Sequence, residues 1–276
     1  MSESVTDASI PAGPGEPTCA NCGEGLRGQF CHACGQKAGH HQLDFHHFAH
    51  EAIHEIVHLD GKIVQTLKLL VSRPGELTRQ FVAGRRVRYI GPIRLYLTFS
   101  ILFFALAAVF PSATGGAFKV GLTPATPGER QSDFRQRLET ATRKAGQQGG
   151  VGVVVMHNLP KSMFVLMPLF GVLTWAFYRR DQRYYIAHLY YAIHFHAFVF
   201  LVLSIALLFS LAGPAGRIAG ALLFWSIVPY HFIALRRVSG GSRWATFWKG
   251  FVIGAIYWFL LLAAVLIVTL LVLLTV

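Results

Sequence analysis

Four cysteines with the spacing of metal ligands are the residues of this chain whose chemistry is easiest to infer. Cys19 and Cys22 form one C-x-x-C-G motif, Cys31 and Cys34 form a second, and the chain has no other cysteine. Each motif presents two thiolates from one tight turn, and its glycine permits a left-handed backbone there. Four sulfurs from two such turns predict a closed tetrahedral Zn²⁺ site, a small zinc ribbon over residues 19–38.

Two other uses of the same sulfurs stay open at this stage. Iron could occupy the four thiolates, and the cysteines could instead pair as disulfides, although a reducing cytoplasm would keep them as thiols. With cysteine at all four positions, the site leaves no open coordination place for catalysis. We therefore expect a structural zinc ion that supplies the folding energy of a module too small to fold alone.

A histidine-rich segment follows the cysteines, with seven of the 13 histidines between His40 and His58. On a helical wheel, its apolar residues gather on one face and its histidines on the other. The pattern predicts the first of several amphipathic helices over 42–90 that lie on the inner membrane surface or on a membrane bundle.

The same segment contains the metalloprotease-like pattern H-E-x-x-H twice, first as His50, Glu51 and His54. This spacing places two imidazoles one helical turn apart, with a glutamate near metal-bound water. Val57 replaces the glycine that would turn the chain back towards a third ligand. The alternatives are a solvated polar face, which we favour, adventitious or regulatory metal binding, and a catalytic metal site.

Composition indicates a membrane protein. The 276 residues are 53% hydrophobic and 14% charged, against roughly 25% charged residues in soluble domains. A span needs about 20 apolar residues. We predict an all-α integral membrane protein with about five transmembrane helices in a domain over 91–276, after a disordered N-terminus over 1–18 that lacks a signal peptide. The spans are expected near 92–110, 162–178, 187–212, 218–235 and 251–276.

The arginines predict how the spans are oriented. The net charge of +12 would suit nucleic acid, but the arginines flank the apolar segments, so nucleic-acid binding is disfavoured. Basic residues precede the first span and separate the second from the third and the fourth from the fifth, whereas the turn between the third and fourth holds only Arg217. The positive-inside rule predicts a cytoplasmic N-terminus, an external C-terminus and an external loop over 111–161.

Four histidines lie within the predicted spans, and ionisable groups there raise a functional hypothesis. His188 and His231 are at matching depth on antiparallel neighbours and could meet, and His194 or His196 could join them. They either make interhelical hydrogen bonds or form a proton- or metal-responsive site. The spans contain no Asp or Glu, which weakens an ion-coupled transporter hypothesis.

The order of these features resembles an uncharacterised family of bacterial inner-membrane proteins, a domain of unknown function. The resemblance covers roughly 19–276. The motifs that carry it are Phe30-Cys31-His32-Ala33-Cys34-Gly35-Gln36, Leu59-Asp60-Gly61-Lys62, Thr66-Leu67, Arg73-Pro74-Gly75, Gly84-Arg85-Arg86-Val87-Arg88-Tyr89, Pro92, Arg94-Leu95-Tyr96, His188-Leu189, His194-Phe195-His196 and Leu235-Arg236-Arg237-Val238. The resemblance implies a zinc-ribbon membrane protein with no established activity, and the histidines of the H-E-x-x-H pattern are not part of it.

The sequence thus favours a non-enzymatic inner-membrane protein that acts as a scaffold or binds a cytoplasmic protein partner through its ribbon. Membrane lipid is the other expected partner, with Arg85, Arg86 and Arg88 meeting anionic headgroups. The alternatives are a transporter or channel subunit that uses the intramembrane histidines and a metal-dependent membrane hydrolase at the H-E-x-x-H pattern.

Overall fold

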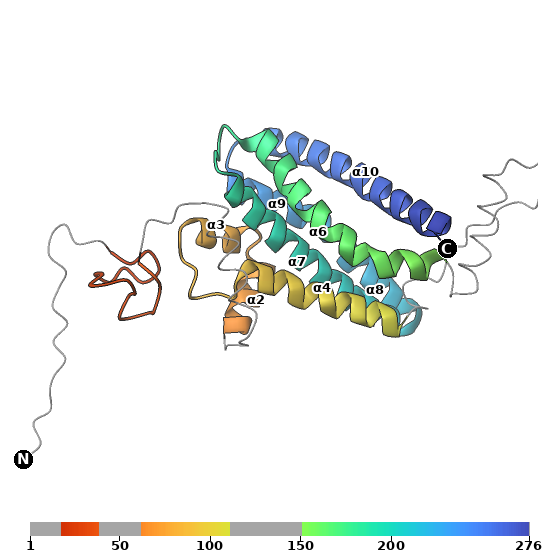
Figure 1. Ribbon diagram of the computed structural model, residues 1–276, viewed down its shortest axis with the longest axis horizontal. Helices are drawn as coiled ribbons and strands as arrows, with labels where there is room; N and C mark the ends of the chain where they lie inside the picture. The colour runs from red at the N-terminus through yellow and green to blue at the C-terminus, as the bar shows by residue number, and fades with distance from the viewer. Residues whose placement is uncertain (1–17, 39–61, 111–150, 276) are drawn as a thin grey trace, which may run out of the picture.

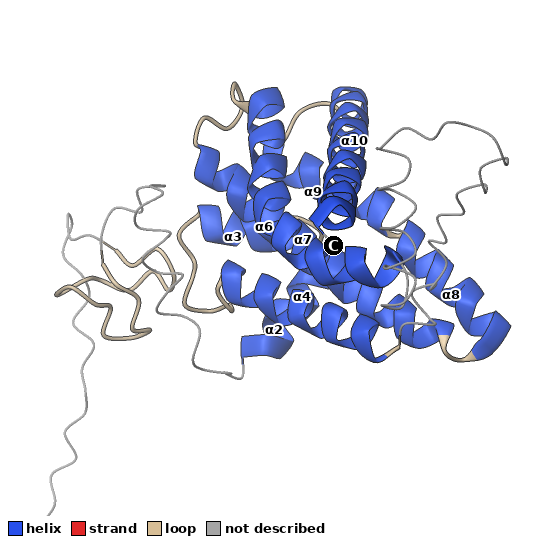
Figure 2. Ribbon diagram, turned by 45° about the vertical axis from the view of Figure 1, so that its right-hand side comes forward, coloured by secondary structure: helices blue, strands red, loops and turns tan. Residues whose placement is uncertain are grey.

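A bundle of long apolar helices makes up most of the structure, a computed structural model that describes residues 18–38, 62–110 and 151–275 (Figure 1). The helices are α2 (Lys62–Ser72), α3 (Glu76–Val82), α4 (Pro92–Val109), α6 (Val151–Tyr178), α7 (Tyr185–Ser210), α8 (Gly213–Trp225), α9 (Ile227–Ser239) and α10 (Arg243–Thr275). Within these residues no strand forms beyond isolated bridges in the ribbon (Figure 2). The all-α prediction is confirmed for this part of the chain.

Five segments are long and apolar enough to cross a membrane: Pro92–Val109, Leu159–Tyr178, Tyr185–Ser210, Gly213–Ser239 and Arg243–Val268. Each overlaps one predicted span. Helices α6 and α10, which contain the second and fifth spans, begin earlier than predicted, at Val151 and Arg243. The final part of the predicted 111–161 loop is therefore helical, and its first part, 111–150, lies outside the described residues.

The fourth predicted span is not one regular helix. It divides at Ser226 into α8 and α9. Proline has no amide hydrogen, so Pro229 cannot donate to the carbonyl of Trp225, four residues earlier. At the junction, the Ser226 hydroxyl donates to the carbonyl of Leu223 at 2.6 Å. Pro160 and Pro168 lie inside the continuous helix α6, so the missing donor at Pro229 accompanies the break but does not by itself explain it.

Helix α7 lies in the middle of the bundle, with α4, α6 and α8 packed along it (Figures 1 and 2). Its sequence is apolar on all sides, the pattern of a buried helix. Ala187, Ala192 and Ala197 are fully buried, and their small side chains allow close approach of the neighbours. On α8, a Cβ at Gly220 would lie 2.8 Å from the backbone oxygen of Ala206, so glycine permits the tight contact of α8 with α7.

The short helices α2 and α3 cover one end of this bundle. Leu70, Leu77 and Phe81 are each almost fully buried, and the rings of Phe81 and Tyr190 lie 5.7 Å apart. The hydroxyl of Tyr230 on α9 donates to the carbonyl of Leu70 at 2.9 Å. The apolar faces of these helices therefore pack on protein.

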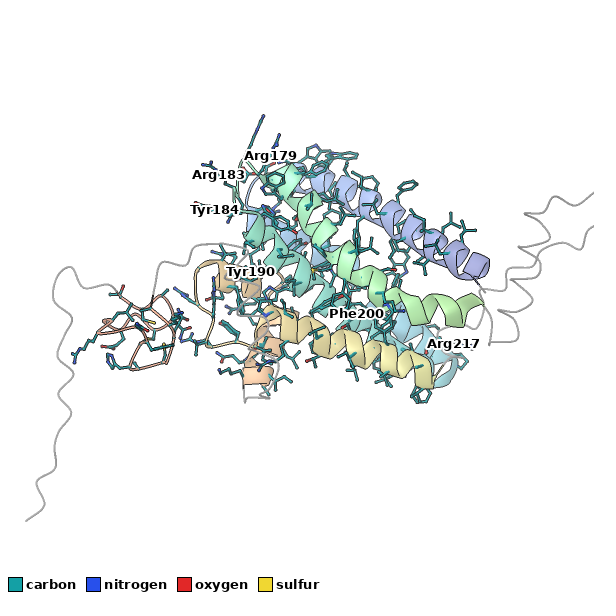
Figure 3. The ribbon with its side chains drawn as sticks, in the orientation of Figure 1. Arg179, Arg183, Tyr184, Tyr190, Phe200 and Arg217 are labelled. Atoms are coloured by element: carbon teal, nitrogen blue, oxygen red, sulfur yellow. The ribbon has the colours of Figure 1, made fainter. Side chains whose placement is uncertain are left out.

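Positive charge gathers at that same end. Arg179, Arg183 and Tyr184 lie at the end nearer α3, whereas Arg217 lies at the opposite end (Figure 3). Arg236 and Arg237 end α9 on the α3 side, where Arg237 donates to the carbonyl of Pro74 at 2.7 Å. The bundle thus has one strongly basic end.

The contact of α3 with α9 predicts a sharp cost for one substitution. Gly75 has φ +79°, and a Cβ there would lie 2.6 Å from the Ala234 backbone oxygen. We expect Gly75→Ala to lower the unfolding free energy by about 1–3 kcal/mol, measured as a lower thermal midpoint in detergent. The control is Gly254→Ala on α10, where a Cβ meets nothing within 4 Å. Equal midpoints for the two variants would contradict the close contact.

Candidate metal centre and its attachment to the bundle

The two cysteine motifs fold into the same backbone turn twice, twelve residues apart. In the first, the amide of Cys19 donates to Glu24 O and the amide of Gly23 donates to Cys19 O, both at 2.8 Å. The second repeats both bonds, from Cys31 to Gln36 and from Gly35 to Cys31, at the same lengths. Gly23 and Gly35 have φ of +82° and +72°, so the expected left-handed glycines are confirmed.

The four sulfurs converge on one point. Sγ of Cys19 lies 3.6 Å from Sγ of Cys34, and Sγ of Cys22 lies 3.5 Å from Sγ of Cys31. All four lie within 4.8 Å of one another. A tetrahedron with Zn–S bonds of about 2.3 Å has edges of about 3.8 Å, so the sulfurs fit a four-coordinate metal ion with little adjustment.

The thiols of this cluster do not ionise alike. Burial raises the pKa of Cys34, but hydrogen bonds from the Gln36 backbone, the Asn21 side chain and neighbouring thiols outweigh it and lower that pKa to about 7. For Cys22, the Glu24 backbone lowers the pKa, while desolvation and shared thiol protons together raise it to about 12. Since only thiolates bind the ion, loading must displace protons, and affinity rises with pH.

The side chain of Gln36 attaches the ribbon to the helical part of the chain. Gln36 is 5% exposed. Its Nε2 donates to the carbonyl of Gly84 at 2.9 Å, and its Oε1 accepts from the amide of Arg86 at 3.3 Å. One amide therefore satisfies a backbone donor and a backbone acceptor of the loop between α3 and α4, as an added strand residue would.

That loop is itself fastened to the bundle. The guanidinium of Arg86 lies 5.9 Å from the ring centre of Tyr190 on α7. The amide of Ile90 donates to Oγ1 of the buried Thr66 at 3.0 Å. Of the three arginines predicted to meet lipid, Arg86 is partly buried in these contacts, whereas Arg85 and Arg88 are exposed.

The four histidines of the predicted spans are all buried, and each has its own partner. His188 Nε2 lies 3.0 Å from the carbonyl of Gln182 rather than against His231. His231 Nδ1 lies 2.9 Å from the Tyr191 hydroxyl. This contact joins α9 to α7 and fits the hypothesis that the histidines make interhelical hydrogen bonds.

His194 and His196 point to different neighbours. His194 Nδ1 lies 3.0 Å from Thr78 Oγ1 on α3, and His196 Nε2 lies 2.6 Å from the Tyr257 hydroxyl on α10. His196 and His231 do share an aromatic neighbour, with ring centres 5.4 and 5.9 Å from that of Phe170. These contacts hold helices together and do not gather the four imidazoles around one ligand.

Within the described residues, the four cysteines are the group of three or more candidate ligands whose donor atoms lie close together. His50, Glu51 and His54 lie outside the described residues, as does the predicted disordered N-terminus up to residue 17. The sequence did not predict that Gln36 joins the ribbon to the loop between α3 and α4. The signal in the sequence was its position directly after the glycine of the second C-x-x-C-G motif.

Comparison with known proteins supports the family resemblance over part of the chain. Residues 60–104 match the family described as "Protein of unknown function (DUF3667)". The matched segment contains α2, α3, the loop that receives Gln36 and most of α4. No curated protein and no solved structure matches the chain. The match begins after the cysteine motifs, and the family description names no activity.

The sulfur geometry predicts the metal content of the purified chain. We expect one zinc ion per chain by elemental mass spectrometry and none after serine replaces all four cysteines, because the site has no other ligands. The ion should leave progressively on acidification, as the thiolates are protonated. The variant with His50→Ala and His54→Ala serves as the control and should keep its full zinc content. Metal retained by the four-serine variant would contradict this assignment.

Proposed function

We propose that this chain is a multi-pass protein of the bacterial inner membrane that holds a structural zinc ribbon on the cytoplasmic face and uses it to bind a protein partner. The attachment of the ribbon through Gln36 carries this proposal. A domain joined by a flexible linker alone would not need a buried amide paired with a loop of the bundle. The docked arrangement fixes which surface of the ribbon remains available.

The sulfur separations of 3.5 and 3.6 Å and the proposed reducing compartment favour a metal ion over disulfides. Zinc is proposed over iron because closed sets of four cysteines are typical of structural zinc sites. A closed set of four ligands holds the module folded and offers no coordination place to a substrate. The proposed role is therefore non-enzymatic.

The proposed orientation rests on the basic end of the bundle. Arg179, Arg183 and Arg237 lie at the end that carries the ribbon attachment, and Arg217 lies at the other end (Figure 3). An excess of arginine marks the cytoplasmic side of a membrane protein. The N-terminus would then be inside the cell and the C-terminus outside.

The ribbon presents an exposed aromatic side chain. Phe30 is 59% exposed, although its backbone bridges Lys37 within the ribbon. Aromatic residues, phenylalanine among them, are enriched in protein–protein interfaces relative to the rest of a protein surface. We assign Phe30 as the anchor of the proposed interface.

Transport through the histidines is the second candidate, and a hydrolase at the H-E-x-x-H pattern is the third. The transport hypothesis is weaker because His188, His194, His196 and His231 are each occupied in contacts between segments of the bundle. The hydrolase hypothesis draws no support from the described residues. The scaffold proposal uses the features that the structure describes.

The orientation predicts which positions an impermeant maleimide reaches in intact cells. Ala215 lies near the start of α8, and Ser242 precedes α10 at the other end; both are exposed. We expect Ala215→Cys to be labelled and Ser242→Cys to be labelled only after the membrane is permeabilised. The unmodified chain is the control for its own four cysteines. The reverse labelling pattern would contradict the proposed orientation.

The partner interface predicts a position-specific cross-link. A photoreactive phenylalanine analogue in place of Phe30 should give a discrete protein adduct in cells, and the adduct should vanish when serine replaces the four cysteines. The same analogue in place of Trp258, which is 58% exposed on α10, is the matched control and should give no such adduct. Equal adducts at both positions, or none at position 30, would rule out Phe30 as the anchor.

A further inference from the structure

A cavity with both charged and apolar lining residues opens beside α3 at the basic end of the bundle. Its volume is about 330 Å³, and residues from four segments line it. Helix α3 contributes Glu76, Arg79 and Gln80, the following loop contributes Arg85, the α6–α7 loop contributes Gln182, and the end of α9 contributes Val238. Two arginines thus line one space of small-headgroup size.

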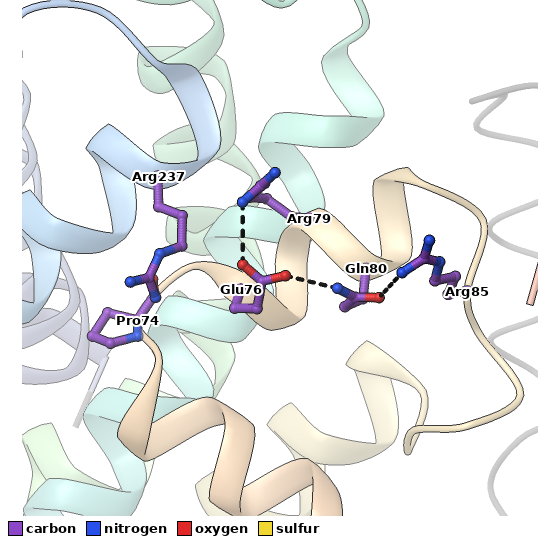
Figure 4. A network of polar contacts seen from close by, with 6 residues as sticks. All are labelled: Pro74, Glu76, Arg79, Gln80, Arg85 and Arg237. Atoms are coloured by element: carbon purple, nitrogen blue, oxygen red, sulfur yellow. Dashed lines mark hydrogen bonds and ion pairs between the residues drawn. The ribbon is translucent and has the colours of Figure 1, made fainter.

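The polar side chains form a chain of hydrogen bonds along one wall (Figure 4). Arg79 Nη1 donates to Glu76 Oε2 at 3.3 Å, and Gln80 Nε2 donates to Glu76 Oε1 at 2.7 Å. Arg85 Nη1 donates to Gln80 Oε1 at 3.3 Å. Both oxygens of the one carboxylate are therefore engaged.

The charge that remains in the cavity is positive. Glu76 offsets Arg79, whereas the contact of Arg85 is to a neutral amide, so the lining carries one net positive charge. Each guanidinium has five N–H donors in a planar fork that matches phosphate oxygens. The cavity is thus suited to an anionic oxygen group and disfavours a cation.

The surroundings place the cavity at the depth of lipid headgroups, if the chain lies in a membrane as proposed above. Tyr184 is exposed at the same end of the bundle (Figure 3). Trp244 and Trp248 are exposed in the first turns of α10, where Lys249 pairs with Asp181 of the α6–α7 loop. Such aromatic residues gather at membrane–water interfaces. Lys249 lies 4.5 Å from the ring centre of Tyr178 in the same region. The lining also includes Val82 and Val238, which offer apolar surface to the glycerol end of a lipid.

We propose that this cavity binds the phosphate of an anionic glycerophospholipid, with Arg79 and Arg85 as its ligands and Gln182 at its rim. The proposal deepens the function proposed above, because the lipid source of the phosphate depends on the membrane location. The phosphate chemistry itself depends only on the two guanidiniums and their geometry.

The test is a titration of the full-length chain in a neutral detergent. Dihexanoyl phosphatidylglycerol is the probe, inorganic phosphate is the second arm, and binding is measured by calorimetry. We expect one saturable site for the lipid, with affinity at least tenfold lower for the double variant Arg79→Gln, Arg85→Gln, since charged hydrogen bonds to phosphate are lost. The matched control, Arg217→Gln at the opposite end, should bind like the unchanged chain.

The outcomes separate the two proposals. Inorganic phosphate that binds as tightly as the lipid would overturn the lipid assignment in favour of a soluble anion. Equal lipid affinity in Arg217→Gln and in the double variant would overturn the site itself. Arg85→Gln alone, at an exposed position, provides a well-folded variant should the double variant unfold. A reversed topology in cells would refute the proposed orientation without altering this binding result.

Discussion

The burial of α7 is the constraint on which the rest of the bundle depends. A helix that is apolar on every side is unfavourable in water, so other helices or lipid must cover its apolar surface. Helices α4, α6 and α8 do so along its length, and α2 and α3 cover its end. Burying its polar groups is costly unless they have partners within the protein. His196 has partners on both ring nitrogens, the Ala192 carbonyl and the Tyr257 hydroxyl. His194 has one, Thr78, and its buried Nε2 has no hydrogen-bond partner.

A series of contacts connects helix α7 to the cysteine cluster through Gln36 and the loop between α3 and α4. Cys34 is two residues from Gln36, and Gln36 holds the backbone of the loop that contains Arg85 and Arg86. Arg86 lies over Tyr190 of α7, while Arg85 lines the proposed phosphate cavity. A metal that folds the second cysteine turn therefore also sets the position of the amide that orders this loop. The ribbon and the cavity share one short segment, and neither can be displaced without affecting that segment.

How far the sequence predicted this arrangement depended on whether the signal was local. The cysteine turns and the five apolar segments were predictable, because each follows from residues adjacent in the chain. The break at Ser226 was not predictable from hydropathy or from Pro229 alone, because α6 continues through Pro160 and Pro168 without a break. The partners of His188 and His231 could not be predicted from depth along the span, because contact also depends on how each helix is rotated about its axis.

The proposed binding role rests on how chemistry is distributed over the described residues. Catalysis needs a reactive group with an open position for substrate. The four cysteines would fill the coordination of a bound metal ion. His188 contacts the Gln182 carbonyl and His231 contacts the Tyr191 hydroxyl. The polar groups that face open space lie instead at the basic end, in the cavity of Arg79 and Arg85 and beside the docked ribbon. These groups lie at one end of a bundle whose interior is packed with apolar side chains, and the proposed binding role rests on that arrangement.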